Sequence, residues 1–321
     1  SGGAFGANIK CAECPGEALE DGEIMENFFK AMNVPFASAT SDDPNEKWPP
    51  YYPNYLNYQV QNFGMTWEGY AEEFQKNGWW SARKVLPESF GSFRRYEIAR
   101  RRKDCLPGFP TPTGKVELWS TALETYCPDM EDAVPRYSEP KKGPVSTPEL
   151  MEKYPFILTT GSRNPTFFHS EHRQLPWCRE QWPVPRVEIN PEDAAELDIK
   201  QGDWVWIEDD QGKVRQAADL YYGINKGVVN ANHTWWYPEL SGYKKGWDLS
   251  AINILVDKDD GDEFSGTSTL RAYPVNIYKA TAENSPFGDP CPCDDDGTEI
   301  ISTSTDPRLK EWLPDYENGR N

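Results

Sequence analysis

Residues 186–208, RVEINPEDAAELDIKQGDWVWIE, carry the clearest structural signal in the chain. Residues 186–189 form a short run of the kind that favours a strand. Asn190 then stands at a favoured N-cap position, Pro191 occupies the first helical position, and two acidic residues follow in the first turn. A second strand-forming run, 204–208, comes soon after. The stretch therefore predicts a strand, a short helix and another strand.

Short strand-forming runs separated by turns continue on both sides of this stretch. Six of them lie between residues 151 and 280, at 156–160, 186–189, 204–208, 214–222, 228–231 and 271–278. Many short strands at close spacing are typical of a closed barrel. We expect an antiparallel or mixed β-barrel, with the helix that begins after Asn190 lying among its strands.

The rest of the chain differs from this region in amino-acid composition. Residues 1–135 are rich in aromatics and turns, with helices expected over 16–32 and 67–80, so an α+β portion is expected there. Residues 136–150 are rich in proline and glycine and indicate a linker. Residues 151–280 form the expected barrel, and residues 281–321 form an acidic tail that wraps the surface or stays mobile.

Composition excludes several classes of protein. The 321 residues contain 33 Lys and Arg against 52 Asp and Glu, a net charge of −19, and aromatics make up 13%. The aromatic content argues against a disordered chain. The acidic excess argues against a nucleic-acid binder and against contact with anionic membranes. No apolar run approaches the roughly 20 residues that span a bilayer, and the compartment, cytoplasmic or periplasmic, stays open.

The seven cysteines do not define a site. Their odd number and irregular spacing make a poor disulfide framework. Cys11 and Cys14 have the spacing of half a metal site, and Cys291 and Cys293 are the pair that would complete it. The alternative is that all of them are ordinary reduced thiols.

Residues 159–173, TTGSRNPTFFHSEHR, are the strongest candidate binding loop. An expected strand ends at Gly161, and the loop after it gathers two arginines and two histidines in an otherwise acidic chain. Glycine lets backbone N–H groups approach a ligand closely, and arginine offers a planar fork of donors to phosphate oxygens. The loop therefore indicates a phosphate or diphosphate site, the alternative being a loop that pairs with neighbouring acids.

Two further features bear on chemistry. His169, His172 and His233 are the only histidines and would be the ligands of a zinc site. Residues 228–239, VVNANHTWWYPE, place a strand directly before His233 and two tryptophans, which either plug the barrel or wall a flat heterocycle. Asn253, among apolar neighbours, needs a backbone or ligand partner wherever it is buried. No self-contained catalytic motif is present, so the catalytic residues stay unknown.

Several of these motifs, in this order, resemble the dimethyl sulfoxide reductase family. The matching stretches are TTGSR at 159–163, HSEHR at 169–173, VEINPEDA at 187–194, IKQGDWV at 199–205 and GVV at 227–229, with GFPTPTGKVELWS at 108–120 upstream. Members of this family carry molybdenum or tungsten on two molybdopterin guanine dinucleotides. The resemblance implies a mainly β fold with a double-psi β-barrel, of the aspartate decarboxylase type, over residues 151–280.

Carried over position by position, the resemblance implies a set of cofactor-binding residues. They are Thr160, Gly161, Ser162, Arg163, Phe168, His169, Ser170, Arg173, His233, Asn253 and Arg271. One departure is NHTWW at 232–236, where relatives commonly have a glycine in the place of Thr234. A close backbone approach to the cofactor is therefore less favoured at that point.

The family's cysteine cluster for a 4Fe–4S centre and its metal-ligand domain have no counterpart here. We therefore expect the C-terminal cofactor-binding portion of a larger catalytic subunit, inactive alone, that acts on a small molecule as a reductase, a dehydroxylase or hydroxytransferase, or a hydratase. Its expected partners are the N-terminal remainder of the same subunit and an iron–sulfur electron-transfer subunit. The alternative is a stand-alone β-barrel that binds a ligand without catalysis.

Overall fold

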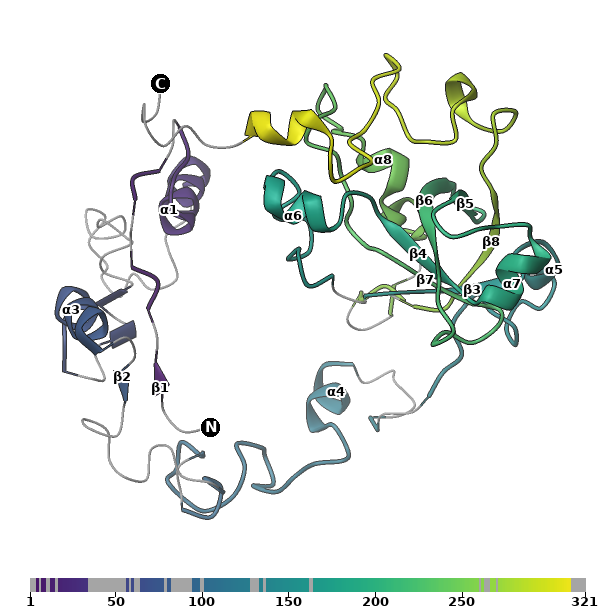
Figure 1. The fold of residues 1–321 in the computed structure, drawn as a ribbon. Helices are drawn as coiled ribbons and strands as arrows, with labels where there is room; N and C mark the ends of the chain where they lie inside the picture. The colour runs from purple at the N-terminus through teal and green to yellow at the C-terminus, as the bar shows by residue number, and fades with distance from the viewer. Residues whose placement is uncertain are drawn as a thin grey trace. The chain divides into compact units, whose positions relative to one another are not determined.

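The computed structural model divides the chain into two compact units, Ser1–Arg136 with Asn318–Asn321, and Tyr137–Glu317 (Figure 1). It describes residues 4–5, 7–9, 12–14, 17–33, 56–57, 59–60, 64–77, 80–81, 94–98, 101–127, 133–134, 137–161, 164–259, 261–262, 266–269 and 271–312. Ser162 and Arg163 of the expected binding loop lie outside these ranges.

The first unit combines short helices with a two-stranded sheet. Strands β1 (Ala4–Phe5) and β2 (Trp80–Ser81) pair antiparallel, and the helices are α1 (Asp21–Met32), α3 (Trp67–Asn77) and α4 (Thr121–Tyr126). Helix α1 starts at a capping box and ends at Asn33, which takes a left-handed conformation with φ 53°. In α3, Tyr70 is buried and packs against Val60. The apolar face expected for α1 exists but is exposed, with Phe28 at 59%.

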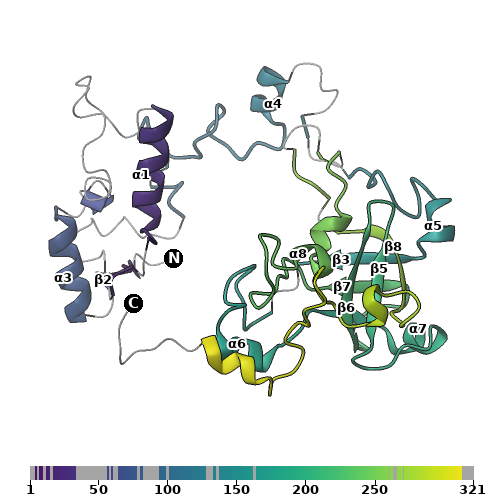
Figure 2. The same cartoon turned by 90° about the horizontal axis from the view of Figure 1, so that it is seen from above.

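The second unit is built on a closed barrel of six strands (Figures 1 and 2). The strands are β3 (Phe156–Thr160), β4 (Arg186–Ile189), β5 (Trp204–Glu208), β6 (Lys213–Leu220), β7 (Val228–Ala231) and β8 (Tyr273–Lys279). Their order around the barrel is β3-β7-β4-β6-β5-β8, closed by the pairing of β8 with β3. The expectation of a mainly β chain with a mixed barrel is therefore confirmed.

Strand direction shows what kind of barrel this is. The pairs β3–β7 and β4–β6 are parallel, and the other four neighbouring pairs are antiparallel. Exchanging the first three strands with the last three (β3 with β6, β4 with β7, β5 with β8) leaves the order and the direction of every pairing unchanged. Two equivalent halves that interlock through parallel pairs are the arrangement of a double-psi barrel, as the resemblance implied.

The barrel interior is filled by alternate residues of the strands. Val187 and Ile189 of β4, Val229 of β7, and Val275 and Ile277 of β8 are fully buried in one cluster. Because successive side chains in a strand point to opposite faces, the residues between them face outward. Closure of the barrel thus determines which side chains are available on its surface.

Short helices fill the connections between strands. They are α5 (Leu150–Lys153), α6 (Pro176–Gln181), α7 (Pro191–Glu196), α8 (Trp247–Ser250), η3 (Ile252–Leu255), η4 (Pro286–Gly288) and η5 (Pro307–Trp312). Helix α7 is capped as expected, since the Asn190 side chain accepts a hydrogen bond from the backbone N–H of Glu192 at 3.0 Å. No helix among the described residues is long and apolar enough to cross a membrane.

The chain after β8 packs on the barrel through a buried ion pair. Arg179 of α6 donates to Glu239 at 2.9 Å, and both side chains are almost completely buried. The same two residues hold the backbone of Ile301, because Arg179 donates to its carbonyl and Glu239 accepts from its N–H. Helix α6 consequently lies beside η5, the yellow helix in Figures 1 and 2.

Replacing Glu239 by Leu is expected to destabilise the second unit by about 3–5 kcal/mol, because Arg179 is left buried and uncompensated. Urea unfolding followed by tryptophan fluorescence measures the loss. The double variant Arg179→Met/Glu239→Leu removes both charges and should lose much less than Glu239→Leu alone. Equal losses in the single and double variants would show that the pair does not hold this region.

Candidate functional site

An open groove of about 380 Å³ lies on the outer surface of the barrel. It is bounded by the end of β3, the outer faces of β4 and β7, the turn after β6, and Arg271, which lies two residues before β8. The lining residues are Thr159, Thr160, Gly161, Glu188, Tyr221, Gly223, Ile224, Asn230 and Arg271. Three of the expected cofactor-binding residues, Thr160, Gly161 and Arg271, are therefore brought together from opposite ends of the barrel sequence.

A row of polar side chains crosses three adjacent strands in the groove. Thr159 on β3 stands opposite Asn230 on β7, and Asn230 stands opposite Glu188 on β4. Leu158 before Thr159, and the residues on both sides of Asn230 and Glu188, belong to the core cluster, so these three side chains face outward. The Asn230 side-chain amide donates to the Glu188 carboxylate at 2.9 Å.

The other end of the groove is positively charged. Gly161 has φ 92°, a conformation that favours glycine, and a Cβ there would lie 3.6 Å from the Arg271 guanidinium. Arg271 is exposed and makes no ion pair with any described residue. A ligand can approach the backbone of Gly161 closely, and the Arg271 guanidinium beside it has no ion-pair partner among the described residues. This arrangement suits an anionic group such as a phosphate.

An aromatic ring forms one wall of the groove. The Tyr221 side chain is 52% exposed and its ring lies against Gly223, where an added Cβ would come within 2.2 Å of it. Any larger residue at 223 would displace the ring. The phenol face is thus held at the edge of the groove, where a flat ring can stack on it.

The expected histidines form a second cluster at the loop after β3. The His169 and His233 rings contact each other, Nδ1 to Nε2, at 3.2 Å, and Phe168 packs edge-on against His169. His169 and Thr234 have φ of 50° and 52°, values that are uncommon for residues with a side chain. Ser170 is fixed through its carbonyl, which accepts from the Trp236 indole at 2.6 Å.

Arg173 holds this loop from the inside. Its guanidinium lies 3.9 Å from the Phe167 ring centroid and 4.3 Å from that of Trp235, and it donates to the carbonyls of His169 and Glu171. Burial, with the nearby charge of Arg179, lowers the pKa of Arg173 to about 9, which leaves it charged at neutral pH. Its observed contacts position His169, and its direct contact with a cofactor stays a prediction.

The same region contains buried polar atoms without partners. They are the side-chain nitrogen of Asn164, Nε of Arg173, Nε1 of Trp235 and the hydroxyl of Thr234, none of which has a hydrogen bond within the described part of the chain. Three of the four are donors only. Buried donors without acceptors are costly, so the region fits a group rich in acceptor oxygens, such as the diphosphate or the pterin of a dinucleotide cofactor.

Gln216 keeps His233 in place. It is completely buried on β6, donates to the carbonyls of Asn232 and Ser250, and accepts from the Asn232 N–H. The Asn232 side chain in turn accepts from the Trp182 indole and from the Arg186 backbone. This network fixes the chain directly before His233.

Asn253 lies apart from both clusters. It is exposed on η3 and does not line the groove, and its contact with a cofactor stays a prediction. The zinc site considered for the three histidines also finds no support, since the described residues contain no group of three or more candidate metal-ligating side chains.

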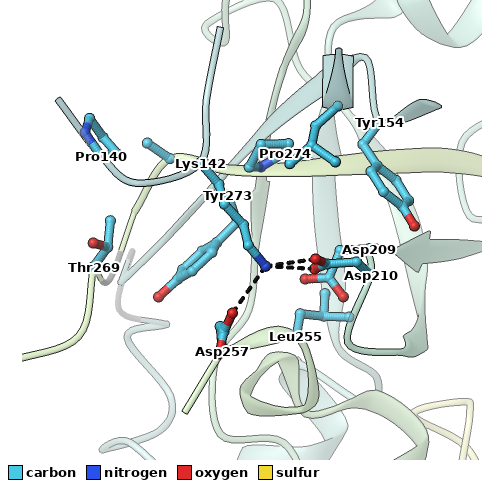
Figure 3. Close-up of a pocket in the computed structure, with 12 residues that line it drawn as sticks. Pro140, Lys142, Tyr154, Asp209, Asp210, Leu255, Asp257, Thr269, Tyr273 and Pro274 are labelled. Atoms are coloured by element: carbon cyan, nitrogen blue, oxygen red, sulfur yellow. Dashed lines mark hydrogen bonds and ion pairs between the residues drawn. The ribbon is translucent and has the colours of Figure 1, made fainter. Parts of the chain in front are cut away.

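A second hollow, shown in Figure 3, is too small for a ligand. Its volume of about 10 Å³ is room for about one water molecule. Lys142 donates there to Asp210 at 2.7 Å and to Asp257 at 3.0 Å, which ties residue 142 to the barrel. Burial alone would lower the pKa of Lys142, but these hydrogen bonds raise it.

Glu188, Asn230 and Tyr221 line the groove but were not among the residues that the sequence indicated. Glu188 and Asn230 are 42 residues apart, and only strand register places them side by side. The available signal was the alternation of apolar and polar residues along strands β4 and β7, which predicts that both side chains point outward. Nothing in the sequence gave the register itself.

Comparison with known proteins agrees with this geometry. Residues 156–274 match the family described as "Molydopterin dinucleotide binding domain". A dopamine dehydroxylase of Eggerthella lenta is 45% identical, with 99% of this chain and 36% of that protein covered. The dimethyl sulfoxide reductase DmsA of Escherichia coli is 30% identical over 58% of this chain and 22% of its own length. The solved structure of acetylene hydratase from Pelobacter acetylenicus superposes with a TM-score of 0.63 at 27% identity, covering 82% of this chain and 33% of that one.

The barrel is therefore a molybdopterin dinucleotide-binding domain, as the resemblance implied. The chain belongs to the dimethyl sulfoxide reductase family and corresponds to a C-terminal part of its molybdopterin enzymes. It spans about a third of the length of the dehydroxylase and of the hydratase structure, and less of the reductase.

Asp209, beside the small hollow, gives a pH-dependent prediction. Burial raises the pKa of Asp209 to about 6, against the hydrogen bonds that it accepts from the N–H groups of Gln211 and Gly212. The folded state therefore binds more protons than the unfolded state between about pH 4 and 6, and stability falls as the pH rises through that window.

Asp209→Asn keeps the acceptor oxygen and removes the charge, so at pH 7 it should be more stable than the parent by about 1–2 kcal/mol. The difference should vanish near pH 4. Urea unfolding at several pH values measures it, with the exposed Asp295→Asn as a matched control. A difference that does not change with pH would contradict the prediction.

Proposed function

We propose that this chain supplies the cofactor-binding barrel of a molybdenum or tungsten bis-molybdopterin guanine dinucleotide enzyme that acts on a small molecule. The observation that carries the proposal is the groove in which Gly161 lies beside Arg271, a guanidinium that makes no ion pair with any described residue. Such a cofactor supplies electron-transfer or oxygen-transfer chemistry at its metal, and the protein supplies binding, orientation and electrostatics.

Individual residues have distinct parts in this proposal. The backbone at Thr160–Gly161 and the Arg271 side chain hold the diphosphate, together with Ser162 and Arg163. His169 and His233, placed by Arg173 and Gln216, provide donors toward the acceptor-rich remainder of the cofactor. Phe168 and Ser170 belong to the same loop.

Each range of the chain has its own role in this proposal. Residues 1–135 contribute to the upstream portion of the enzyme, 136–150 connect it to the barrel of residues 151–280, and the segment 281–321 follows. The N-terminal remainder of the same subunit is the partner of this chain, and an iron–sulfur subunit is the source of electrons.

Among the reaction types of the family, a dehydroxylase is favoured. A relative that is 45% identical and aligns with nearly the whole chain is named a dopamine dehydroxylase. In such a reaction an aromatic C–OH takes up two electrons and two protons, the C–O bond breaks, and the products are the C–H compound and water. A small aromatic substrate with adjacent hydroxyl groups is therefore the proposed class.

Arg271→Ala in the enzyme that carries this chain should weaken cofactor binding by about 1.5–3 kcal/mol, the range for a hydrogen bond that involves a charged group. Metal content by mass spectrometry and guanine nucleotide released by acid hydrolysis measure the loss. Arg163→Ala should act in the same way, whereas the exposed Lys200→Ala should retain full content. Unchanged content in both arginine variants would contradict the proposed diphosphate site.

The substrate class has its own test. With reduced methyl viologen as electron donor, the complete enzyme should convert a catecholamine to the product that lacks one hydroxyl group, as measured by mass spectrometry. Acetylene should not be consumed under the same conditions. Consumption of acetylene without any dehydroxylated product would place the enzyme among the hydratases.

A further inference from the structure

We propose that one side of helix α1, the purple helix in Figure 1, is the surface on which the N-terminal remainder of the same subunit docks. The surface consists of Ile24, Met25, Phe28 and Met32, and we call it the α1 face. This inference rests on the proposed function, because it names the residues through which the proposed partner is bound.

The α1 face is a continuous apolar stripe along the helix. Ile24, Phe28 and Met32 follow one another at intervals of four residues, and Met25 lies beside them, so their side chains share one side of the helix. On the other side, Lys30 pairs with the carboxylate four residues before it. The helix is therefore amphipathic, with one side suited to contact with a hydrophobic core.

No described residue covers the α1 face. Its four side chains are between 38% (Ile24) and 65% (Met32) exposed, and no residue of α1 is buried. In α3, by contrast, Tyr70 is buried against Val60. A helix of 12 residues is marginal in water on its own, because most of the stability of a helix in a protein comes from packing of its apolar side. The caps of α1 determine where it begins and ends, but they do not supply this packing.

The first unit as a whole buries little apolar surface in the part of the chain that the structure describes. Its buried apolar side chains there are Val60, Tyr70 and Ala133, whereas the barrel buries a large continuous cluster. Leu118 and Trp119, just before α4, are exposed like the α1 face. A domain of more than 100 residues normally buries most of its apolar surface, and large exposed apolar patches mark interaction sites. The unit therefore has the surface of a domain that other residues complete.

The lengths of the relatives favour the rest of the same polypeptide as the occupant of the α1 face. The dopamine dehydroxylase aligns with 99% of this chain, yet only 36% of that protein is covered. In the acetylene hydratase structure the matched part is likewise 33% of the chain. A segment of the same polypeptide is present at a high effective concentration, so a contact as small as one helix side is sufficient to hold it.

A second copy of this chain is the competing occupant, and charge disfavours it. Each copy has a net charge of −19, and proteins with a net charge far from zero repel one another and stay monomeric. The α1 face is also the apolar side of its helix, so it offers no cation to offset that repulsion. Self-association and docking of the N-terminal remainder give different results in the experiments below.

The test compares hydrogen exchange, followed by mass spectrometry, in the purified 321-residue chain and in the complete enzyme that carries it. The amides of α1 should exchange at least about tenfold more slowly in the complete enzyme, because docking suppresses the local opening of the helix. The amides of β6, which is hydrogen-bonded on both sides within the barrel, should exchange slowly in both proteins.

The double variant Phe28→Gln/Met32→Gln makes the α1 face polar and keeps good helix formers in the helix. In the complete enzyme it should speed exchange of the α1 amides by about tenfold or more, toward the rate in the isolated chain. In the isolated chain it should leave that rate unchanged. Lys30→Gln, on the other side of the same helix, is the matched control and should retain the slow exchange.

Sedimentation velocity of the isolated chain at several concentrations tests for a second copy. We expect a monomer throughout the range. A dimer that forms with rising concentration and is lost in Phe28→Gln/Met32→Gln would identify another copy as the occupant and overturn the proposal.

The outcomes separate this inference from the proposed function. Exchange of α1 that is equally fast or equally slow in the isolated chain and in the complete enzyme overturns the docking role of the α1 face. So does slow exchange that survives Phe28→Gln/Met32→Gln. The proposed function is judged instead by cofactor content in Arg271→Ala and Arg163→Ala, which does not depend on the exchange of α1.

Discussion

Closure of the barrel determines the register of every strand, and that register assembles the groove. In a closed barrel each strand is hydrogen-bonded on both sides, so no strand can slip without breaking two ladders. Thr159, Asn230 and Glu188 form a continuous row only because β7 is placed between β3 and β4. The same closure pairs β8 with β3, which brings Arg271 to the end of β3 at Gly161.

Three buried arginines organise the connections around this barrel. Arg173, Arg179 and Arg215 are at most 2% exposed, and each donates to backbone carbonyls of a loop or of the segment after β8. Only Arg179 has a buried carboxylate partner among the described residues. Arg173 lies between two aromatic rings instead, and burial lowers the pKa of both Arg173 and Arg215. In a chain of net charge −19, planar guanidinium groups thus hold loops whose carbonyls have no strand to pair with.

Much of the barrel could be predicted from the sequence, because short apolar runs and turn residues carry local information. Strands β3, β4, β5 and β7 begin and end at the predicted residues, and Asn190 caps α7 as expected. Strand β8 begins two residues later than predicted, since Ala272 takes a φ of 74° that a strand cannot contain. In the site, Gly161 and Arg271 could be identified, but the pairing of Glu188 with Asn230 depends on register between distant strands. The burial of Arg173 was also hidden, because a basic residue in a loop is more often exposed.

The two ends of the groove differ in what they can contribute to recognition. Arg271 and the backbone at Gly161 suit a diphosphate, because a guanidinium and backbone N–H groups match the charge and geometry of phosphate oxygens. Glu188 and Asn230 lie on adjacent strands and are linked to each other, so their donors and acceptors are fixed before any ligand arrives. A fixed pair on a rigid scaffold loses little entropy when a ligand binds to it. The strands therefore carry polar groups that are fixed in advance, whereas the loop at 164–173 holds His169 and His172 in left-handed conformations that are uncommon for residues with a side chain.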